Sequence, residues 1–243
     1  MRAAGGGWTG APISVAAWAV QMLGPLLNGY WDAAAADTLD LSGDTVTAWR
    51  DQVSGLVLTG IGSPAFANSG GVPRIELDGI GDGFELPNPP FPIGNAPSET
   101  WALVRQDAIA GDDASVRTAI GYGGPGTGRR IDRAVNGGVN STWGVSASTV
   151  AANLSTDMSG LHLLRLAVSA NAVSIGVDRD AVVSKATMPA TAGTRLRVGA
   201  NPGPDTPNQF WHGAIIAVLN TQPLSPYHVT RMRQFADLRM GLA

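Results

Sequence analysis

The 243-residue sequence predicts an all-β protein: an antiparallel two-sheet β-sandwich with an N-terminal arm and a short C-terminal helix. Three observations predict this fold class. The 32 glycines and 16 prolines are spread along the chain, as expected where turns join many short strands. Several segments alternate apolar and polar residues, which is the pattern of a half-buried strand. Apolar residues make up 44% of the chain and charged residues 14%, so the chain can bury a core.

Residues 1–29 form a Gly-rich and apolar segment, which we separate from a single domain predicted at residues 30–243. The apolar stretch Ala11–Leu27 is interrupted by two prolines, a glycine and a glutamine, so it is too short for a membrane span. Arg2 is the only positive charge before it, which disfavours a signal peptide. We expect an arm or short helix at Val15–Leu23 that packs on the domain or on a neighbouring subunit of a homo-oligomer.

Strand patterns follow one another through the rest of the chain. Thr45–Arg50 alternates apolar and polar residues. Leu161–Ser169 and Ala172–Asp178 indicate a hairpin that turns at Ala170–Asn171. Gly213–Asn220 is an almost unbroken apolar run, which predicts a central strand. The other predicted strands are Gly55–Ile61, Pro73–Leu77, Thr100–Arg105, Ser115–Tyr122, Thr142–Ser146 and Arg195–Gly199.

Only the C-terminal segment is convincingly helical in its pattern. Ser225 is a suitable N-cap, and Pro226 occupies the first helical position, where a missing N–H has no cost. Apolar residues then recur at helical spacing, so the sequence predicts a closing helix. These apolar residues are Val229, Met232, Phe235 and Leu238.

Short motifs recur between Tyr30 and Leu242 in a particular order. They are Tyr30–Ala33, Trp49–Gly55, Pro73–Asp82, Ile175–Arg179, Leu196–Gly199 and Phe210–Val218. In order and spacing they resemble the laminin-G-like branch of the concanavalin A-like superfamily. Three substitutions depart from the pattern: Leu77 replaces an aromatic residue, Arg179 a glycine and Ala217 an acidic residue. In addition, Trp49–Gly55 has one extra residue, Gln52 or Val53. The resemblance implies a concanavalin A-like jelly roll, and such a fold does not by itself determine an activity.

The sequence offers little for catalysis. Related sandwiches hydrolyse polysaccharides with a Glu-x-Asp-x-x-Glu motif on one strand, because this reaction needs two carboxyl groups close together. Glu76 and Asp78 begin such a pattern, but Gly81 stands in place of the second glutamate. A Gly-x-Ser-x-Gly motif is absent from the sequence, and its three histidines are scattered. We expect a non-enzymatic protein, with a diverged polysaccharide hydrolase as an alternative.

Composition also limits the ligands. The net charge of −3 argues against nucleic acid as a partner, and the lack of cysteine excludes disulfides and thiolate metal sites. Gly121–Gly126 matches the letters of a dinucleotide-binding loop, but the next strong element is a strand, so we expect a hairpin loop. We expect no cofactor and assign no metal ligands. Calcium stays an alternative because carboxylates are available at Asp78, Asp82, Asp112 and Asp113.

Surface recognition is the function class that remains. Sugar-binding surfaces combine flat aromatic faces with polar side chains, and the chain has seven tryptophans, of which we expect Trp49, Trp101 and Trp211 in the core. The loops at Gly123–Arg133 and Asn201–His212 are rich in suitable polar groups, although ordinary solvated loops would have a similar composition. The predicted ligand-binding residues are Arg129, Arg130, Trp143, Asp205, Asn208, Gln209 and His212.

The resemblance also implies a biological context, because stand-alone modules of this kind occur among phage structural proteins. We therefore expect a spike, fibre or decoration protein of a phage or phage-like particle, located on the virion or another extracellular surface. It would bind a host-surface polysaccharide or glycan and would contact other particle proteins through residues 1–29. The alternative is a purely structural virion subunit or adaptor that contacts only protein neighbours.

Overall fold

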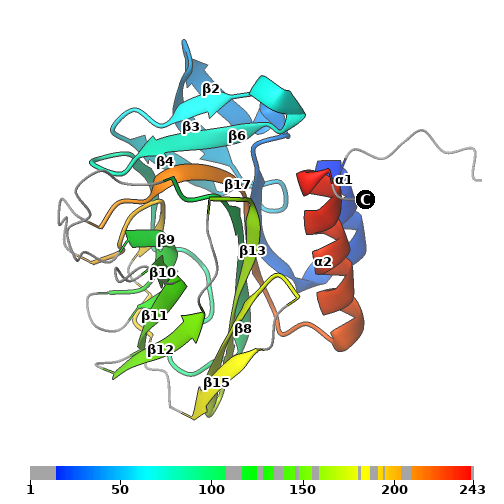
Figure 1. The fold of residues 1–243 in the computed structure, drawn as a ribbon, viewed down its shortest axis with the longest axis vertical. Helices are drawn as coiled ribbons and strands as arrows, with labels where there is room; N and C mark the ends of the chain where they lie inside the picture. The colour runs from blue at the N-terminus through cyan, green and yellow to red at the C-terminus, as the bar shows by residue number, and fades with distance from the viewer. Residues whose placement is uncertain are drawn as a thin grey trace, which may run out of the picture.

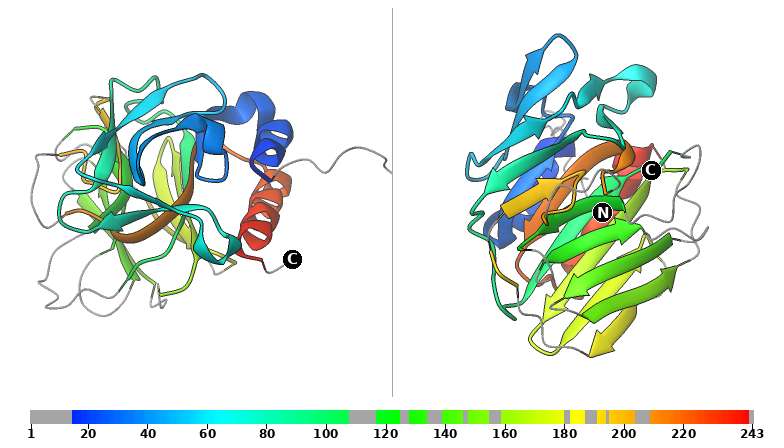
Figure 2. Two further views of the ribbon diagram at one scale, coloured as in Figure 1. Left: turned by 90° about the horizontal axis from the view of Figure 1, so that it is seen from above. Right: turned by 90° about the vertical axis from the view of Figure 1, so that its left-hand side faces the viewer.

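The chain forms two layers of strands, with two helices on the outside of one layer (Figures 1 and 2). Every pairing between its named strands, within the residues that the structure describes, is antiparallel. This confirms the predicted antiparallel sandwich. The computed structural model describes residues 15–107, 117–124, 128–133, 139–145, 148–154, 159–179, 182–186, 191–193, 195–203 and 209–241.

The elements have the following bounds. The helices are α1 (Val15–Leu23) and α2 (Pro226–Met240), with short 3₁₀ helices at Gly24–Leu26, Ala36–Thr38 and Ser69–Gly71. The strands are β1 (Leu27–Asp32), β2 (Leu39–Ser42), β3 (Thr45–Arg50), β4 (Val57–Ile61), β5 (Ala65–Ala67), β6 (Arg74–Asp78), β7 (Gly83–Pro87), β8 (Ser98–Val104), β9 (Arg117–Tyr122), β10 (Arg129–Arg133), β11 (Val139–Val145), β12 (Ser148–Leu154), β13 (His162–Ser169), β14 (Ala172–Val177), β15 (Val183–Ala186), β16 (Arg195–Val198) and β17 (His212–Thr221).

Most of the predicted strands are confirmed. The bounds of β3 are those predicted, and the β13–β14 hairpin turns at the expected place, since Ser169 pairs with Ala172. The apolar strand β17 is central, because it pairs with β1, β6 and β8. The strands β2, β5, β7, β10, β12 and β15 lack a clear apolar pattern and were not expected. Among them, β10 corrects the loop predicted at Gly123–Arg133, because residues 129–133 pair with β9 instead.

One continuous hydrogen-bonded sheet supplies both layers. The first layer has the strand order β10-β9-β16-β7-β4-β3, and the second has the order β6-β17-β8-β13-β14-β15. The three-residue strand β5 pairs with both β3 and β6, so the sheet turns over at this narrow connection. In addition, β1 pairs with β17, β2 pairs with β3, and β11 and β12 form a separate two-stranded sheet.

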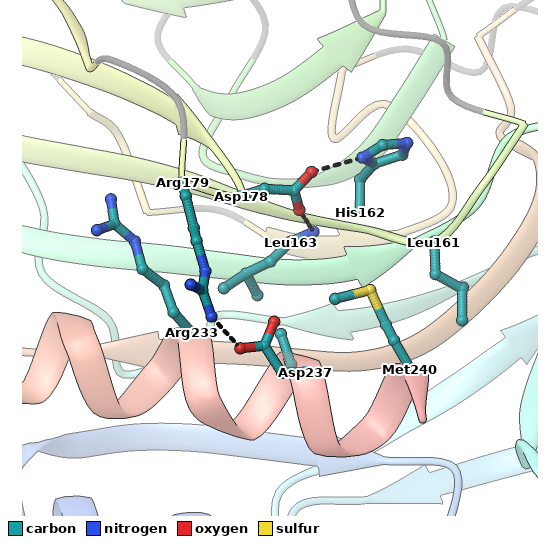
Figure 3. Close-up of a pocket in the computed structure, with 9 residues that line it drawn as sticks. Leu161, His162, Leu163, Asp178, Arg179, Arg233, Asp237 and Met240 are labelled. Carbon is teal, nitrogen blue, oxygen red and sulfur yellow. Dashed lines mark hydrogen bonds and ion pairs between the residues drawn. The ribbon is translucent and has the colours of Figure 1, made fainter. Parts of the chain in front are cut away.

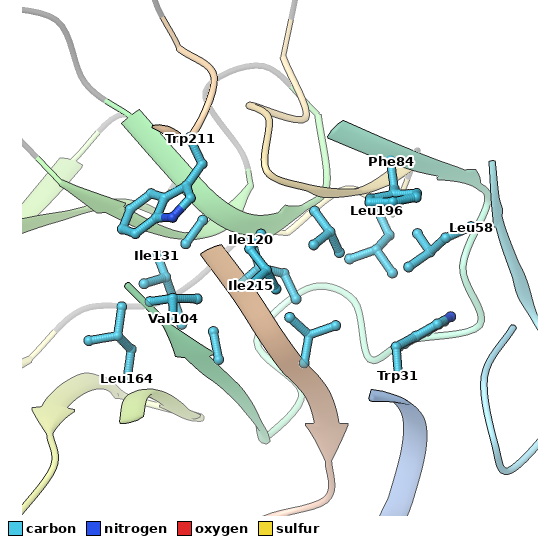
Figure 4. Close-up of a cluster of buried hydrophobic side chains, with 14 of the residues drawn as sticks. Trp31, Leu58, Phe84, Val104, Ile120, Ile131, Leu164, Leu196, Trp211 and Ile215 are labelled. Atoms are coloured by element: carbon cyan, nitrogen blue, oxygen red, sulfur yellow. The ribbon is translucent and has the colours of Figure 1, made fainter. Parts of the chain in front are cut away.

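The main core fills the space between the two layers (Figure 4). Alternate residues of each strand point inward, so Phe84 and Leu196 of the first layer meet Val104 and Ile215 of the second in one apolar cluster. Trp49 and Trp211 are fully buried in the same cluster, as predicted. Trp101 is also buried, as predicted, but in the separate cluster under the helices.

A second core lies on the outer face of the β17 layer, where α1 and α2 cover the sheet (Figure 1). Ala19 and Leu23 of α1 are buried there, and Trp18 stacks on Phe235 of α2 with ring centroids 6.1 Å apart. The helix predicted at Val15–Leu23 is thus confirmed, and it packs on its own sandwich. The division of the chain at residues 29 and 30 stays a prediction. Of the helices in the described residues, none has the length and apolar character to cross a bilayer.

The ends of α2 follow the predicted capping signals. The Ser225 side chain accepts a hydrogen bond from the His228 backbone N–H, and Gly241 ends the helix in the left-handed conformation. An α-helix has 3.6 residues per turn, so residues spaced three apart move gradually around the helix and off its buried face. For this reason Leu238, the last residue of the apolar series, is 45% exposed. The residues that α2 buries are Met232, Phe235, Ala236 and Arg239.

The motif at Trp49–Gly55 ties two parts of the fold together. The Asp51 carboxylate accepts hydrogen bonds from the backbone N–H groups of Tyr30 at 3.0 Å, Val53 at 2.8 Å and Ser54 at 2.7 Å. One carboxylate therefore closes the turn after β3 and holds β1 beside it. Asp51 and Ser54 of this motif therefore have structural roles in this chain.

A buried ion pair connects α2 to β1. Arg239 Nη2 donates to Asp32 Oδ1 at 2.6 Å, and Tyr30 Oη donates to Asp32 Oδ2 at 2.7 Å. The Asp32 side chain is fully buried and that of Arg239 is nearly so. Burial raises the pKa of Asp32, while the Arg239 guanidinium opposes this rise. The Arg239 charge therefore offsets the cost of burying the Asp32 carboxylate.

We predict that Arg239→Met lowers the free energy of unfolding by about 3–5 kcal/mol, because it leaves the Asp32 charge buried without its cation. Urea unfolding measures the effect. Arg233→Met on the same helix is the matched control, since Arg233 makes no hydrogen bond or ion pair with another described residue. Equal effects of the two substitutions would contradict the role of the ion pair.

Candidate ligand-binding groove

A row of four polar residues and one glycine crosses the outer face of the first layer. Thr59, Glu85, Arg197, Gly121 and Arg130 pair in sequence across β4, β7, β16, β9 and β10. Their neighbours in each strand face the core, so these five positions face away from it. We call this set the polar row. It lies on the side of the molecule away from α1 and α2 (Figures 1 and 2).

One end of the polar row is hollowed. The hollow has a volume of about 460 Å³, and we call it the outer groove. Its polar lining comes from Thr59, Glu85 and Arg197, and its apolar lining includes Phe210. The groove therefore offers hydrogen-bonding groups beside apolar surface, as binding sites for small organic molecules commonly do. The remaining lining residues are Gly60, Ile61 and Pro87.

Glu85 is the acidic centre of the polar row. Arg197 Nε donates to Glu85 Oε2 at 2.7 Å, and Arg195 Nη1 donates to the same oxygen at 3.4 Å. Arg197 Nη1 also donates to the carbonyl oxygen of Asn201 at 3.0 Å. The Arg197 side chain is 6% exposed, whereas that of Arg195 is 38% exposed. Arg197 therefore fixes Glu85, and Arg195 is the arginine better placed to donate to a bound molecule.

Gly121 allows the chain after β16 to approach the polar row closely. A Cβ atom at this position would lie 2.8 Å from Arg130 Cγ and 2.9 Å from Pro202 Cδ, both closer than real Cβ contacts. Pro202 thus packs against the sheet where another residue would carry a side chain. The consequence is that Asn201, next to Pro202, is held near Arg197 and supplies its carbonyl acceptor.

Asp132 is a fully buried carboxyl group beside the polar row. Thr118 Oγ1 donates to Asp132 Oδ1 at 2.6 Å, and Arg130 Nε lies 3.3 Å from Asp132 Oδ2 without hydrogen-bond geometry. Burial raises the pKa of Asp132 to about 6, against the opposing effect of Arg130. The contact of Arg130 with Asp132 is therefore weak, and the Arg130 side chain is 22% exposed.

The structure corrects the prediction that Arg129 binds a ligand. Arg129 is 1% exposed because the register of β10 turns it into the end of the sandwich. Its guanidinium donates to Ser98 Oγ, to Tyr122 Oη at 2.9 Å and to Thr191 Oγ1 at 2.8 Å, as well as to two backbone carbonyl oxygens. Alternation along β10 then places its neighbour Arg130 on the outer face.

The other predicted site residues separate into three groups. Arg130 belongs to the polar row, at the end away from the outer groove. The Gln209 side-chain oxygen accepts a hydrogen bond from Asn201, whose carbonyl oxygen binds Arg197 of the groove. His212 belongs to β17 of the other layer, where it pairs with Asp78. The structure therefore does not bring His212 to the polar row.

The other three predicted residues lie wholly or partly outside the described part of the chain. Trp143 lies in β11, but its side chain is outside the described residues, as are Asp205 and Asn208 entirely. Their predicted roles stay predictions. Sequence reasoning missed Thr59, Glu85, Arg195 and Arg197. The alternation in Arg195–Val198 (Arg-Leu-Arg-Val) was the available signal, because it marks two arginines on one face of a strand.

The two carboxylates of the hydrolase motif, Glu76 and Asp78, are already bound by other groups of the protein. Glu76 forms ion pairs with Arg74 and Arg105, the latter at 3.2 Å. Asp78 Oδ1 accepts hydrogen bonds from three backbone N–H groups, those of Ile80, Gly81 and Asp82, and these donors lower the pKa of Asp78 against the effect of burial. Asp78 therefore acts as a turn residue.

The calcium alternative gains no support at the aspartates that can be examined. The Asp82 carboxylate accepts a hydrogen bond from the Ser63 backbone N–H at 2.7 Å, and Asp78 is held by the amides of its own turn. Within the described part of the chain, no group of three or more His, Cys, Asp or Glu side chains is arranged to hold a metal ion. Asp112 and Asp113 lie outside the described residues.

Comparison with solved structures identifies similar folds. Domain 4 of AbnA, a GH43 extracellular arabinanase from Geobacillus stearothermophilus, in complex with arabinotriose, has a TM-score of 0.60 and 19% identity, covering 86% of this chain and 98% of that domain. A Trypanosoma rangeli sialidase complex has a TM-score of 0.59 and 12% identity, covering 88% of this chain and 32% of the sialidase. The botulinum neurotoxin serotype D binding domain has a TM-score of 0.58 and 9% identity, covering 86% and 50%.

These similarities show a shared β-sandwich fold. The chain spans nearly all of the arabinanase domain, but only about a third of the sialidase and half of the toxin domain. A scan against protein-family models gives no match, and a search of curated proteins also gives none. The laminin-G-like branch therefore stays a prediction within the confirmed fold class.

We predict that Asp132→Asn removes a pH dependence of stability. From about pH 4 to about pH 6 the folded chain keeps a proton on Asp132 that the unfolded chain releases, so wild-type stability falls as the pH rises through this window. The free energy of unfolding of the Asn variant should rise relative to wild type by roughly 2–3 kcal/mol across the window.

Urea unfolding at several pH values through this window checks the prediction. Asp44→Asn, at an exposed position in the turn between β2 and β3, is the matched control and should leave the wild-type profile unchanged. A wild-type profile that runs parallel to that of Asp132→Asn would show that Asp132 does not titrate there.

Proposed function

We propose that the chain is a non-enzymatic carbohydrate-binding module and that a glycan lies along the outer groove and the polar row. The observation that carries this proposal is the alignment of Thr59, Glu85 and Arg197 across three neighbouring strands at the hollowed end of the polar row, before Pro202 covers Gly121. Neighbouring strands lie about 4.8 Å apart, so an extended polymer that crosses them meets a new position at each strand. A polysaccharide suits this repeat, because its successive rings present hydroxyl groups at similar intervals.

The chemistry of the outer groove supports a sugar as the ligand. Sugar hydroxyl groups both donate and accept hydrogen bonds. Glu85, in the groove, is a partly exposed acceptor held in place by Arg197. Arg195, beside the groove on the same strand as Arg197, and Arg130, at the other end of the polar row, are partly exposed donors. Phe210 lines the same hollow and, although it is 8% exposed, contributes to its apolar surface. The polar row thus resembles a binding surface in both its composition and its fixed geometry.

The comparisons support the same class of ligand. The arabinanase domain, nearly all of which corresponds to this chain, is described in complex with arabinotriose, and the second protein is a sialidase. Since both proteins act on or bind sugars, a sugar ligand is the function class that the shared fold favours. The identities of 19% and 12% are too low to carry over individual residues, so the proposed contacts rest on this chain's own geometry.

The proposal that the module is not an enzyme has its own support. Glu76 is bound by arginines and Asp78 by backbone amides, so neither carboxyl group is free to act as the proton donor or nucleophile of a retaining hydrolase. Release of reducing ends from a polysaccharide by the purified protein, abolished by Glu76→Gln, would overturn this part of the proposal and favour the diverged hydrolase.

We further propose the finer context that the resemblance implies: a spike, fibre or decoration protein of a phage or phage-like particle, binding host carbohydrate at an extracellular or virion surface. In this context the N-terminal arm, residues 1–29, contacts neighbouring particle proteins. Genes for capsid and tail proteins beside this gene would support the proposal, and a neighbourhood without them would contradict it. If the protein assembles on a particle but binds no glycan, the structural adaptor is favoured instead.

We predict that Arg195→Gln and Arg130→Gln each weaken glycan binding about tenfold or more, because each removes a charge-assisted hydrogen bond worth about 1.5–3 kcal/mol. A glycan array first identifies a ligand of the wild-type protein, and calorimetric titration then compares the variants. Arg231→Gln is the control, since Arg231 lies on α2 over Trp18, on the other side of the molecule. Retained affinity in both groove variants, with an unchanged melting temperature, would place the glycan elsewhere.

A further inference from the structure

A second hollow lies on the opposite side of the molecule from the outer groove, between α2 and the open end of the β13–β14 hairpin (Figure 3). It has a volume of about 370 Å³ and shares no lining residue with the outer groove. We call it the helix pocket. Its lining combines apolar side chains with five residues that are charged or titratable. The nine lining residues are Leu161, His162, Leu163, Asp178, Arg179, Arg233, Ala236, Asp237 and Met240.

One carboxylate of the helix pocket is held by the hairpin itself. Asp178 Oδ1 accepts a hydrogen bond from the Leu163 backbone N–H at 2.8 Å, and Asp178 Oδ2 lies 2.7 Å from His162 Nδ1. The backbone of Asp178 is left-handed, with φ of 49°, and its N–H donates to the Leu163 carbonyl oxygen. This conformation directs the carboxylate back onto β13, where it also orients the imidazole.

The second carboxylate is paired as well, which leaves one arginine of the helix pocket without a partner among the described residues. Asp237 of α2 forms an ion pair with Arg179, which reaches it from the end of β14 (Figure 3). The Arg233 side chain extends from α2 toward the strands in the same view. Among the described residues, Arg233 has no hydrogen-bond or ion-pair partner, although it is only partly exposed. The two acids are thus satisfied by other groups, and Arg233 is available to bind an anion.

We propose that the helix pocket binds a small organic carboxylate, with Arg233 as its ion-pair partner. A guanidinium presents two parallel N–H groups that match the geometry of a carboxylate. The rest of such a molecule lies against Leu161, Ala236 and Met240, which supply the apolar part of the lining. The site goes beyond the proposed glycan groove, because it is formed by other elements and recognises a charge.

The size of the helix pocket limits this ligand. A volume of about 370 Å³ is at the lower end of sites for small organic molecules, which run from roughly 300 to 1,000 Å³. It suits a single ring or a short aliphatic chain that carries a carboxylate. Two sources supply this chemistry: a free aliphatic acid, and an acidic sugar such as a uronic acid at the end of a glycan. The shared feature is a carboxylate next to an apolar face.

Titration followed by NMR tests the proposal with three probes: hexanoate, glucuronate and uncharged glucose. We expect saturable binding of at least one acid and weaker or no binding of glucose. Arg233→Gln should weaken the bound acid about tenfold or more, since it removes a charge-assisted hydrogen bond. Arg233→Lys keeps the charge but loses the two-point geometry, so it should give an intermediate loss. Preference for hexanoate or for glucuronate identifies the source of the carboxylate.

Two controls separate this site from the other surfaces. Arg231→Gln changes an arginine of the same helix that contacts Trp18 and Gln234 and lies outside the helix pocket, so it should leave acid binding unchanged. Arg195→Gln, beside the outer groove, should also leave it unchanged. The proposal is overturned if neither acid binds, if glucose binds as well as the acids, or if Arg233→Gln and Arg231→Gln have equal effects. Failure of the glycan proposal would leave all of these results unaffected.

Discussion

The structure depends on one constraint: the layer built around β17 must be covered on both faces. β17 is almost entirely apolar, and its residues are buried on both sides. The first layer covers the inner face, where Ile215 and Val218 join the main core, and the two helices cover the outer face, where Ile216 and Leu219 lie. Each Å² of apolar surface left in contact with water would lower the stability of the fold by roughly 25 cal/mol. The N-terminal and C-terminal helices are therefore parts of the sandwich core.

This covering determines where charge can be tolerated. Asp32 and Arg239 connect β1 to α2 inside the outer core, and Arg129 satisfies five acceptors at the end of the main core. A buried guanidinium is compensated only when its fork of donors is filled, which explains this number of hydrogen bonds. The arginines on the outer face of the first layer have fewer partners. The same residue type is thus structural in one place and available for binding in another.

The two hollows follow from the same architecture. No helix in the described part of the chain covers the outer face of the first layer, so Glu85 and Arg195 remain partly exposed there. The β17 layer is covered by helices, and the helix pocket lies where α2 runs past the open end of the β13–β14 hairpin. A regular sheet face with one residue per strand suits an extended polymer, whereas the gap beside a helix suits a compact molecule. Each proposed ligand therefore matches the shape of the element that forms its site.

The sequence by itself determined the local features: the alternation of Thr45–Arg50, the hairpin turn at Ala170–Asn171, the cap at Ser225 and the centrality of β17. Each depends on residues near one another in the chain, so a single segment carries the information. The polar strand β10 and the joining of the layers through β5 were not predictable, because both are decided by pairing with distant strands. That pairing buried Arg129, exposed Arg130 and aligned Glu85 with Arg197. The tertiary structure alone decided the site, because register between strands sets which polar residues share a face.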